Sequence, residues 1–269
     1  MLKIISIAAN TFKEVVREPV FYLLVIVGCL MVVLARFMPM FTINEDVKMM
    51  KDIGLSTVTV TGLLIALLAA SRVVYSEIEG RTAVTVVAKP VRRFQFILGK
   101  YLGIVGAVLL AVFVMTLVFA GMVWWQVMDL YLPADQQFAL QLRGVGNVAV
   151  GCLLSFFQVL VLAAVSVAVS VYANMVVNVG FCFAVFLLGN LSGWFLLETL
   201  PNTVTAPWLQ FVAKLVLGAL PFLETYNVQA LALGTTIPYS YMLLAFGYAA
   251  YYSCAMLVVA ILLFQRREL

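Results

Sequence analysis

One stretch of 54 consecutive residues, 144–197, contains no charged side chain. As a single helix, rising about 1.5 Å per residue, it would be roughly 80 Å long, whereas the hydrocarbon core of a bilayer is about 30 Å thick. The stretch must therefore fold back on itself. We place the break at 172–178, where Tyr172, Asn174 and Asn178 separate two apolar runs. The sequence thus predicts two membrane-crossing helices joined by a short turn.

The rest of the chain has the same character. Of its 269 residues, 65% are hydrophobic and 10% are charged, and the mean hydropathy is +1.13. An ordinary soluble domain is about 45–50% apolar and about 25% charged. There is too little polar material here to cover a core, so a water-soluble fold is excluded. We expect one all-α integral membrane domain over residues 1–269.

Charge-free intervals locate the membrane spans, because a charge at mid-bilayer is costly and a crossing helix needs about 20 apolar residues. They predict six transmembrane helices, at about 20–40, 56–74, 101–125, 147–171, 177–197 and 240–264. The outer segment 198–238, between the fifth and sixth spans, is apolar but broken by prolines, so we expect it to be re-entrant or interfacial.

Alternating the loops between the two sides of the membrane gives the orientation. Eleven lysines and arginines then fall on one side and five on the other. The positive-inside bias puts the richer side, with both termini and residues 72–100, in the cytoplasm. We expect a multi-pass protein of the cytoplasmic (inner) membrane.

The N-terminal residues 2–17 have an apolar face, with Ile5, Ala8 and Phe12 at helical spacing, and a polar face. This pattern predicts an amphipathic helix at the inner membrane surface. Two roles are open for it: a surface anchor, or part of a docking site for a cytosolic partner. A lipoprotein signal ending at Cys29 is disfavoured, because six more apolar residues follow that cysteine.

Two absences narrow the chemistry. The chain has no histidine, which excludes the His-based zinc, proton-relay and nucleophile sites. Its four cysteines lie in apolar runs without CxxC spacing, as packing residues do. We therefore expect no enzyme, no metal site, no cofactor and no nucleic-acid partner.

The segment 72–100 is the most specific part of the sequence, with eight of the 28 charged residues. Gly80 permits a turn, Thr82 can cap a short helix over 82–88, and Pro90 ends it. A short helix held between two spans can transmit a push from a partner into the membrane. The alternative is that the basic residues only fix topology and hold anionic lipid headgroups.

The order of residues in this segment resembles the permease subunits of ABC-2 type transporters. The matching positions are an acidic pair with a turn, a Lys-Pro, an Arg-Arg and a Gly-Lys: Glu77, Glu79, Gly80, Arg81, Thr82, Lys89, Pro90, Arg92, Arg93, Gly99 and Lys100. A PFLETYN element at 221–227 and the closing FQRREL add to the resemblance.

The resemblance implies that 82–88 is a coupling helix that docks on a separate ATPase subunit, and that two permeases, identical or paralogous, work with two ATPases. ATP and Mg would then be bound by the partner. This chain has no Walker A loop, because Phe94 stands where its first glycine would be and no Ser or Thr follows Lys100.

Several polar side chains lie within the predicted spans. They are candidates for lining a translocation path: Gln158, Asn178, Asn190, Tyr248 and Tyr252. Such residues also serve as hydrogen-bond partners between helices. Gly99, Gly103 and Gly106 form a small face that favours close helix packing.

The function that we expect is therefore the permease subunit of an ATP-driven ABC-2 type exporter. The alternative is a membrane assembly or regulatory protein that anchors an ATPase without moving a solute. An intramembrane enzyme is a weaker alternative, because the spans lack paired aspartates or a Ser with a Lys.

Overall fold

A computed structural model of the chain describes residues 2–37, 46–75, 93–128, 134–194, 220–226 and 238–266. Over these ranges the protein is all-helical and has no strand. The elements, in chain order, are α1 Leu2–Arg17, α2 Pro19–Leu34, α3 Asp46–Ala70, the π-helical turn η2 Ser71–Tyr75, α6 Arg93–Met128, α7 Ala134–Ser170, α8 Met175–Trp194, the 3-10 turn η4 Leu223–Tyr226 and α12 Tyr239–Arg266.

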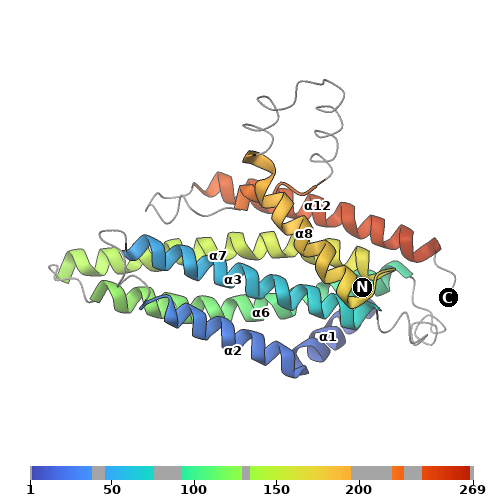
Figure 1. Cartoon of the computed structure of the whole chain (residues 1–269), viewed down its shortest axis with the longest axis horizontal. Coiled ribbons are helices and arrows are strands. Elements are labelled where there is room, and N and C mark those ends of the chain that lie inside the picture. The colour runs from blue at the N-terminus through green and yellow to red at the C-terminus, as the bar shows by residue number, and fades with distance from the viewer. Residues whose placement is uncertain are drawn as a thin grey trace, which may run out of the picture.

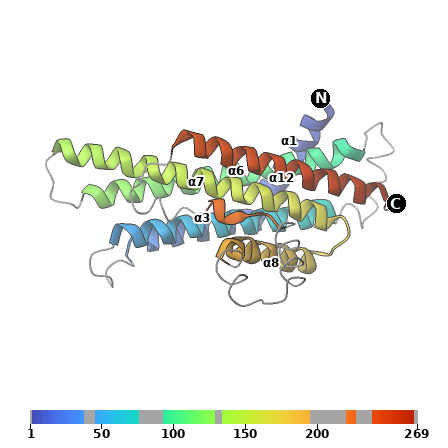
Figure 2. The ribbon, with the colours of Figure 1, turned by 90° about the horizontal axis from the view of Figure 1, so that it is seen from above.

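The long helices α3, α6, α7 and α12 run along the long axis of the bundle (Figures 1 and 2). Helix α7 is the central one: 78% of its most apolar stretch is buried, against 22% for α12. α3, α6, α8 and α12 all pack against α7. The core of the molecule therefore surrounds one helix, and α12 lies at the periphery.

Among the described residues, four helices are long and apolar enough to cross a membrane: Met49–Val74, Arg93–Met128, Phe138–Ser170 and Tyr239–Gln265. α1 and α2 are bent by 66° at their junction and together make a fifth candidate span. The described part of α8, Met175–Leu191, is apolar but shorter. The all-α architecture is thus confirmed and is compatible with a multi-pass membrane protein, while the count of six crossings stays a prediction.

The outer surface of the bundle is apolar. Leu243, Leu244 and Tyr251 on α12 are 71–75% exposed, and Val176 on α8 is 80% exposed. Large apolar side chains exposed to this degree are costly in water and are normal against lipid tails. The surface therefore fits the apolar composition of the chain.

Several helices extend beyond the apolar spans from which they were predicted. α3 begins at Asp46, not near 56, α6 begins at Arg93, and α7 begins at Ala134, not near 147. The charge-free intervals detect only the part of a helix suited to lipid, whereas backbone hydrogen bonding continues past that part. At 36 residues and about 1.5 Å each, α6 is roughly 54 Å long.

A break after the fourth span is present as predicted, but it covers 171–174 and not 172–178, so Asn178 lies in the first turn of α8. Asn174 caps α8, because its side-chain oxygen accepts a hydrogen bond from the backbone N–H of Val177 at 3.0 Å. The Tyr172 hydroxyl donates to the carbonyl of Leu263 on α12 at 3.1 Å. Two of the three polar residues that predicted the break, Tyr172 and Asn174, thus fix the turn itself.

α1 packs closely on α6, through the predicted glycine face. A Cβ on Gly99 would lie 2.7 Å from Ile7 Cγ2, and one on Gly103 would lie 2.7 Å from the carbonyl oxygen of Ala8. Gly106 faces Phe12. The apolar face of the amphipathic helix is therefore at least partly occupied by protein.

One end of the bundle collects α1, the end of α3, the start of α6, the turn between α7 and α8, and the end of α12 (Figures 1 and 2). Hydrogen bonds and ion pairs described below join these elements. They are the parts predicted to share the cytoplasmic side, and we call this end the root of segment 76–92.

Replacing Gly103 with alanine tests the α1–α6 contact. We expect the free energy of unfolding to fall by about 1–3 kcal/mol, because the new methyl group overlaps the backbone of α1. Gly121 is the control, since nothing lies within 4 Å of a Cβ built there, and its alanine variant should be neutral or stabilising. Detergent-induced unfolding measures both, and equal effects would contradict the contact.

Candidate functional site

Most of the predicted coupling residues lie outside the described ranges. These are Glu77, Glu79, Gly80, Arg81, Thr82, Lys89, Pro90 and Arg92. Arg93 is described, and so are the residues that border segment 76–92 on each side. The geometry described below is therefore that of the root, the helix ends on either side of segment 76–92.

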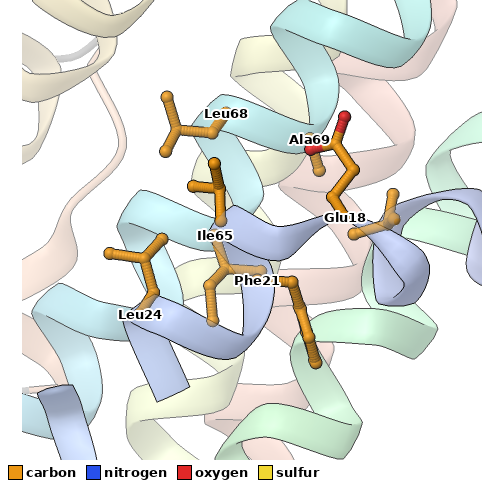
Figure 3. Close-up of a pocket in the computed structure, with 8 residues that line it drawn as sticks. Glu18, Phe21, Leu24, Ile65, Leu68 and Ala69 are labelled. Atoms are coloured by element: carbon orange, nitrogen blue, oxygen red, sulfur yellow. The ribbon is translucent and has the colours of Figure 1, made fainter. Parts of the chain in front are cut away.

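On the N-terminal side of segment 76–92, Arg72 of η2 forms an ion pair with Glu18, with 3.2 Å between Nη1 and Oε1. Both side chains are partly exposed, at 41% and 29%. Glu18 lies at the junction of α1 and α2, at the rim of a small hollow between α2 and α3 (Figure 3). The hollow is otherwise apolar and is lined by Val15, Val20, Phe21, Leu24, Ile65, Leu68 and Ala69.

On the C-terminal side of segment 76–92, Lys100 of α6 forms an ion pair with Glu14, with 3.6 Å between Nζ and Oε2. The Lys100 side chain is only 4% exposed, whereas Glu14 is 42% exposed. The Lys100 ammonium also lies 5.7 Å from the centre of the Phe96 ring. A cation–π contact of this kind adds to the stabilisation of a partly desolvated charge.

Arg93 joins the start of α6 to the end of α12. Its guanidinium donates to the carbonyl oxygens of Phe264 and Gln265, at 3.3 and 3.0 Å, and lies 5.8 Å from the centre of the Phe264 ring. The last carbonyls of a helix have no partner within the helix and carry partial negative charge, so a cation there is favourable. The Phe96 and Phe264 rings stack beside it, 5.7 Å apart.

Two acidic residues, Glu14 of α1 and Glu18 at the junction of α1 and α2, are functional candidates that the sequence did not reveal. Glu14 and Glu18 are four residues apart and bind cations from opposite borders of segment 76–92. Their spacing alone gave no signal, because Glu18 is the extended N-cap of α2 and shares no helix face with Glu14. α1 and its junction with α2 are thus tied to the helices on both sides of the segment.

Asn178 links three helices at the same end of the bundle. The side chain is completely buried, and its Nδ2 donates to Ser71 Oγ at 2.7 Å and to Ser166 Oγ at 2.8 Å. The Cys182 thiol donates to Asn178 Oδ1 at 3.4 Å. Asn178 therefore serves as a packing joint here, and its place beside Ser71 connects it to the root.

Gln158 and Asn190 form a second polar pair, between α7 and α8. Gln158 Nε2 donates to Asn190 Oδ1 at 3.1 Å, and Asn190 Nδ2 donates to the Phe186 carbonyl one turn back at 2.8 Å. Gln158 is 5% exposed. Both amides have partners within the protein, as interhelical hydrogen-bonding residues do.

Tyr248 and Tyr252 belong to a third cluster, on α12. Their rings lie 6.2 Å apart, and Tyr226 of η4 lies 6.4 Å from Tyr248. The Tyr248 hydroxyl accepts from the backbone N–H of Phe222 at 2.8 Å, while Tyr226 donates to the Ala245 carbonyl at 3.1 Å. This cluster holds the described part of the PFLETYN element against α12.

The five candidate path residues therefore fall into three separate clusters. An open apolar groove of about 240 Å³ lies between α7 and α12, lined by Leu153, Phe157, Tyr239, Met242, Leu243 and Phe246. None of the five lines this groove or the hollow beside Glu18. Within the described residues, no group of three His, Cys, Asp or Glu side chains is arranged to hold a metal ion.

No protein-family model matches the chain, and no curated protein matches it significantly. The function must therefore be argued from the residues and their geometry.

Leucine at position 158 or 190 tests the amide pair. Each single variant should lower the free energy of unfolding by about 0.6–2 kcal/mol, the usual range for such bonds in membrane proteins. The double variant should cost little more than the larger single, because both changes remove one shared bond. Unfolding of the purified protein in mixed detergent measures this, and strictly additive costs would contradict the pairing.

Glutamine at position 14 or 18 tests the two ion pairs. Glu14→Gln should cost about 1 kcal/mol and Glu18→Gln less, because Lys100 is far more buried than Arg72. Raising the salt concentration should remove the cost of Glu18→Gln before that of Glu14→Gln. The same unfolding assay, at low and high salt, gives both results, and the reverse order would contradict these pairs.

Proposed function

We propose that this protein is the permease subunit of an ATP-driven transporter of the ABC-2 type, working as an exporter. A separate ATPase subunit binds segment 76–92 from the cytoplasm and supplies ATP and Mg. A second permease, either another copy or a paralogue, completes the membrane path. This chain itself catalyses no reaction.

The observation that carries the proposal is the combination of a specific charged segment with its anchored root. The ordered residues from Glu77 to Arg93 resemble the coupling segment of ABC-2 permeases. At the root, Lys100 is held by Glu14 of α1, Arg72 by Glu18 at the junction of α1 and α2, and Arg93 by α12. A force on the segment would therefore reach several helices at once.

In the proposed mechanism, closure of the ATPases on ATP moves the short helix 82–88. Because that helix lies between α3 and α6 in the chain, its movement tilts both. The tilt switches a path at the interface of the two permeases. Through Glu14 and Glu18, α1 and its junction with α2 follow the same movement.

Alanine substitution of Glu77, Glu79 and Arg81 tests the proposed docking segment. The chain is affinity-purified from its native cells, copurifying ATPases are identified by mass spectrometry, and the ATPase is then coexpressed with each variant. We expect the triple variant to lose the ATPase or its substrate-stimulated activity. Unchanged complex formation and unchanged stimulated activity would overturn the proposal.

The matched control is the triple alanine variant of Glu45, Asp46 and Lys48. It likewise removes two acidic residues and one basic residue, but at the N-terminal end of α3. It should bind and stimulate the ATPase as the unchanged protein does.

The proposed orientation places both termini in the cytoplasm of a bacterial or archaeal inner membrane. In a variant without the four native cysteines, a single cysteine replacing Leu269 should react with an impermeant maleimide only after the cells are opened. A cysteine replacing Asn44 should react in intact cells. The opposite labelling pattern would contradict the orientation.

The second candidate function is a membrane anchor or regulator of an ATPase that moves no solute. It is favoured by one observation: the five candidate path residues hydrogen-bond or stack in separate clusters. Substrate flux into proteoliposomes, with and without ATP, separates the two functions. ATP-dependent flux supports the permease, and ATPase binding without flux supports the anchor.

A further inference from the structure

Asn178 occupies a special position at the root. It lies in the first turn of α8, while its two amide hydrogens go to a serine of η2 and a serine of α7. All three side chains are at most 2% exposed. One amide group thus joins α3, α7 and α8 at a single buried point.

Ser71 is bonded on both sides. Its hydroxyl donates to the Leu67 carbonyl at 2.8 Å and accepts from Asn178, so the hydroxyl hydrogen and one lone pair are both used. Ser71 is also the first residue of η2, where the α-helical hydrogen-bond pattern of α3 changes to a π-helical one. Such π-turns are frequent at functional sites. The hydrogen bond from Asn178 is made to the residue at which this change begins.

The other side of the joint is equally fixed. Asn174 caps α8 one turn before Asn178, and the Tyr172 hydroxyl bonds to α12. These two hydrogen bonds fix the turn at 171–174, which directly precedes the helix that contains Asn178. η2 ends at Tyr75, directly before segment 76–92.

We propose that Asn178 is a positioning residue that holds η2 to α7 and α8, so that a displacement of η2 carries α8 along with α3. The consequence for transport rests on the proposed function. The joint itself is a property of this chain alone and can be tested without an ATPase.

The proposal separates Asn178 from the other buried amide pair. Gln158 and Asn190 also join α7 to α8, but their hydrogen bonds to each other and to the Phe186 carbonyl involve neither α3 nor η2. Gln158→Leu is therefore a matched control: it removes an interhelical amide bond between the same two helices and leaves the root untouched.

Hydrogen–deuterium exchange on the full chain in lipid nanodiscs tests the joint. In Asn178→Leu, backbone amides of 71–75 should exchange about threefold to thirtyfold faster, the range that corresponds to losing one such bond. Gln158→Leu should leave 71–75 unchanged and act near 186–190. The joint is overturned if Asn178→Leu leaves 71–75 unchanged, or if both variants accelerate that turn equally.

Ser71→Ala is the second variant, because it removes only an oxygen atom and retains the Asn178 side chain. It should accelerate exchange in η2 by a similar factor. In the Ser71→Ala, Asn178→Leu double variant the acceleration should not exceed the larger single effect, because both changes break the same bond. Multiplying effects would overturn the joint.

The last measurement is the amount of solute moved per ATP hydrolysed by the complex in proteoliposomes. Asn178→Leu should lower this ratio severalfold while the ATPase stays bound, and Tyr101→Phe, which removes the interhelical bond to the Leu160 carbonyl and leaves the joint intact, should leave it unchanged. An unchanged ratio for Asn178→Leu overturns the positioning role. If no ATPase binds the chain, the proposed function fails, and the exchange data alone then decide whether the joint exists.

Discussion

Buried polar groups in a bundle with an apolar outer surface have little water to bond, so a partner within the chain stabilises them. In the described part of the chain, Thr11 Oγ1 and Glu224 Oε2 are buried without such a partner. This constraint explains where the helices of the protein are fixed to one another. Thr59 donates to Ser155 between α3 and α7, and Tyr101 and Ser253 both donate to the Leu160 carbonyl from α6 and α12. Apolar packing alone leaves helices free to rotate or slide, whereas each of these bonds has one geometry. The polar residues therefore set the register of the bundle.

The charged contacts follow a different rule and gather at one end. Arg72, Arg93 and Lys100 are each held by another part of the chain: Glu18 at the junction of α1 and α2, the last carbonyls of α12, and Glu14 of α1, respectively. Charges are tolerated there because that end can reach water, as the partial exposure of Arg72 and Glu14 indicates. The buried joint at Asn178 lies beside them. The root of segment 76–92 thus combines screened ion pairs with a desolvated hydrogen-bond network.

The sequence was sufficient for features that depend on local pattern. The apolar helices, the break at Tyr172 and Asn174, and the close contact at Gly99 and Gly103 were all predicted and found. The pairings were not predictable, because they depend on which helix faces which. Ser71 and Asn178 are 107 positions apart, and no local pattern connects them. Glu14 and Glu18 were similarly unremarkable until α1 was seen against α6 rather than lying by itself at the membrane surface.

The central position of α7 gives the molecule an internal frame of reference. α3, α6, α8 and α12 all pack on this helix, so a displacement of any of them can be described as movement relative to α7. Leu153 on α7 is 36% exposed, at the edge of the groove shared with α12, and is therefore a position where a spectroscopic label disturbs little packing. Distances from this position to labels on the outer helices would separate tilting of individual helices from motion of the whole bundle in the bilayer.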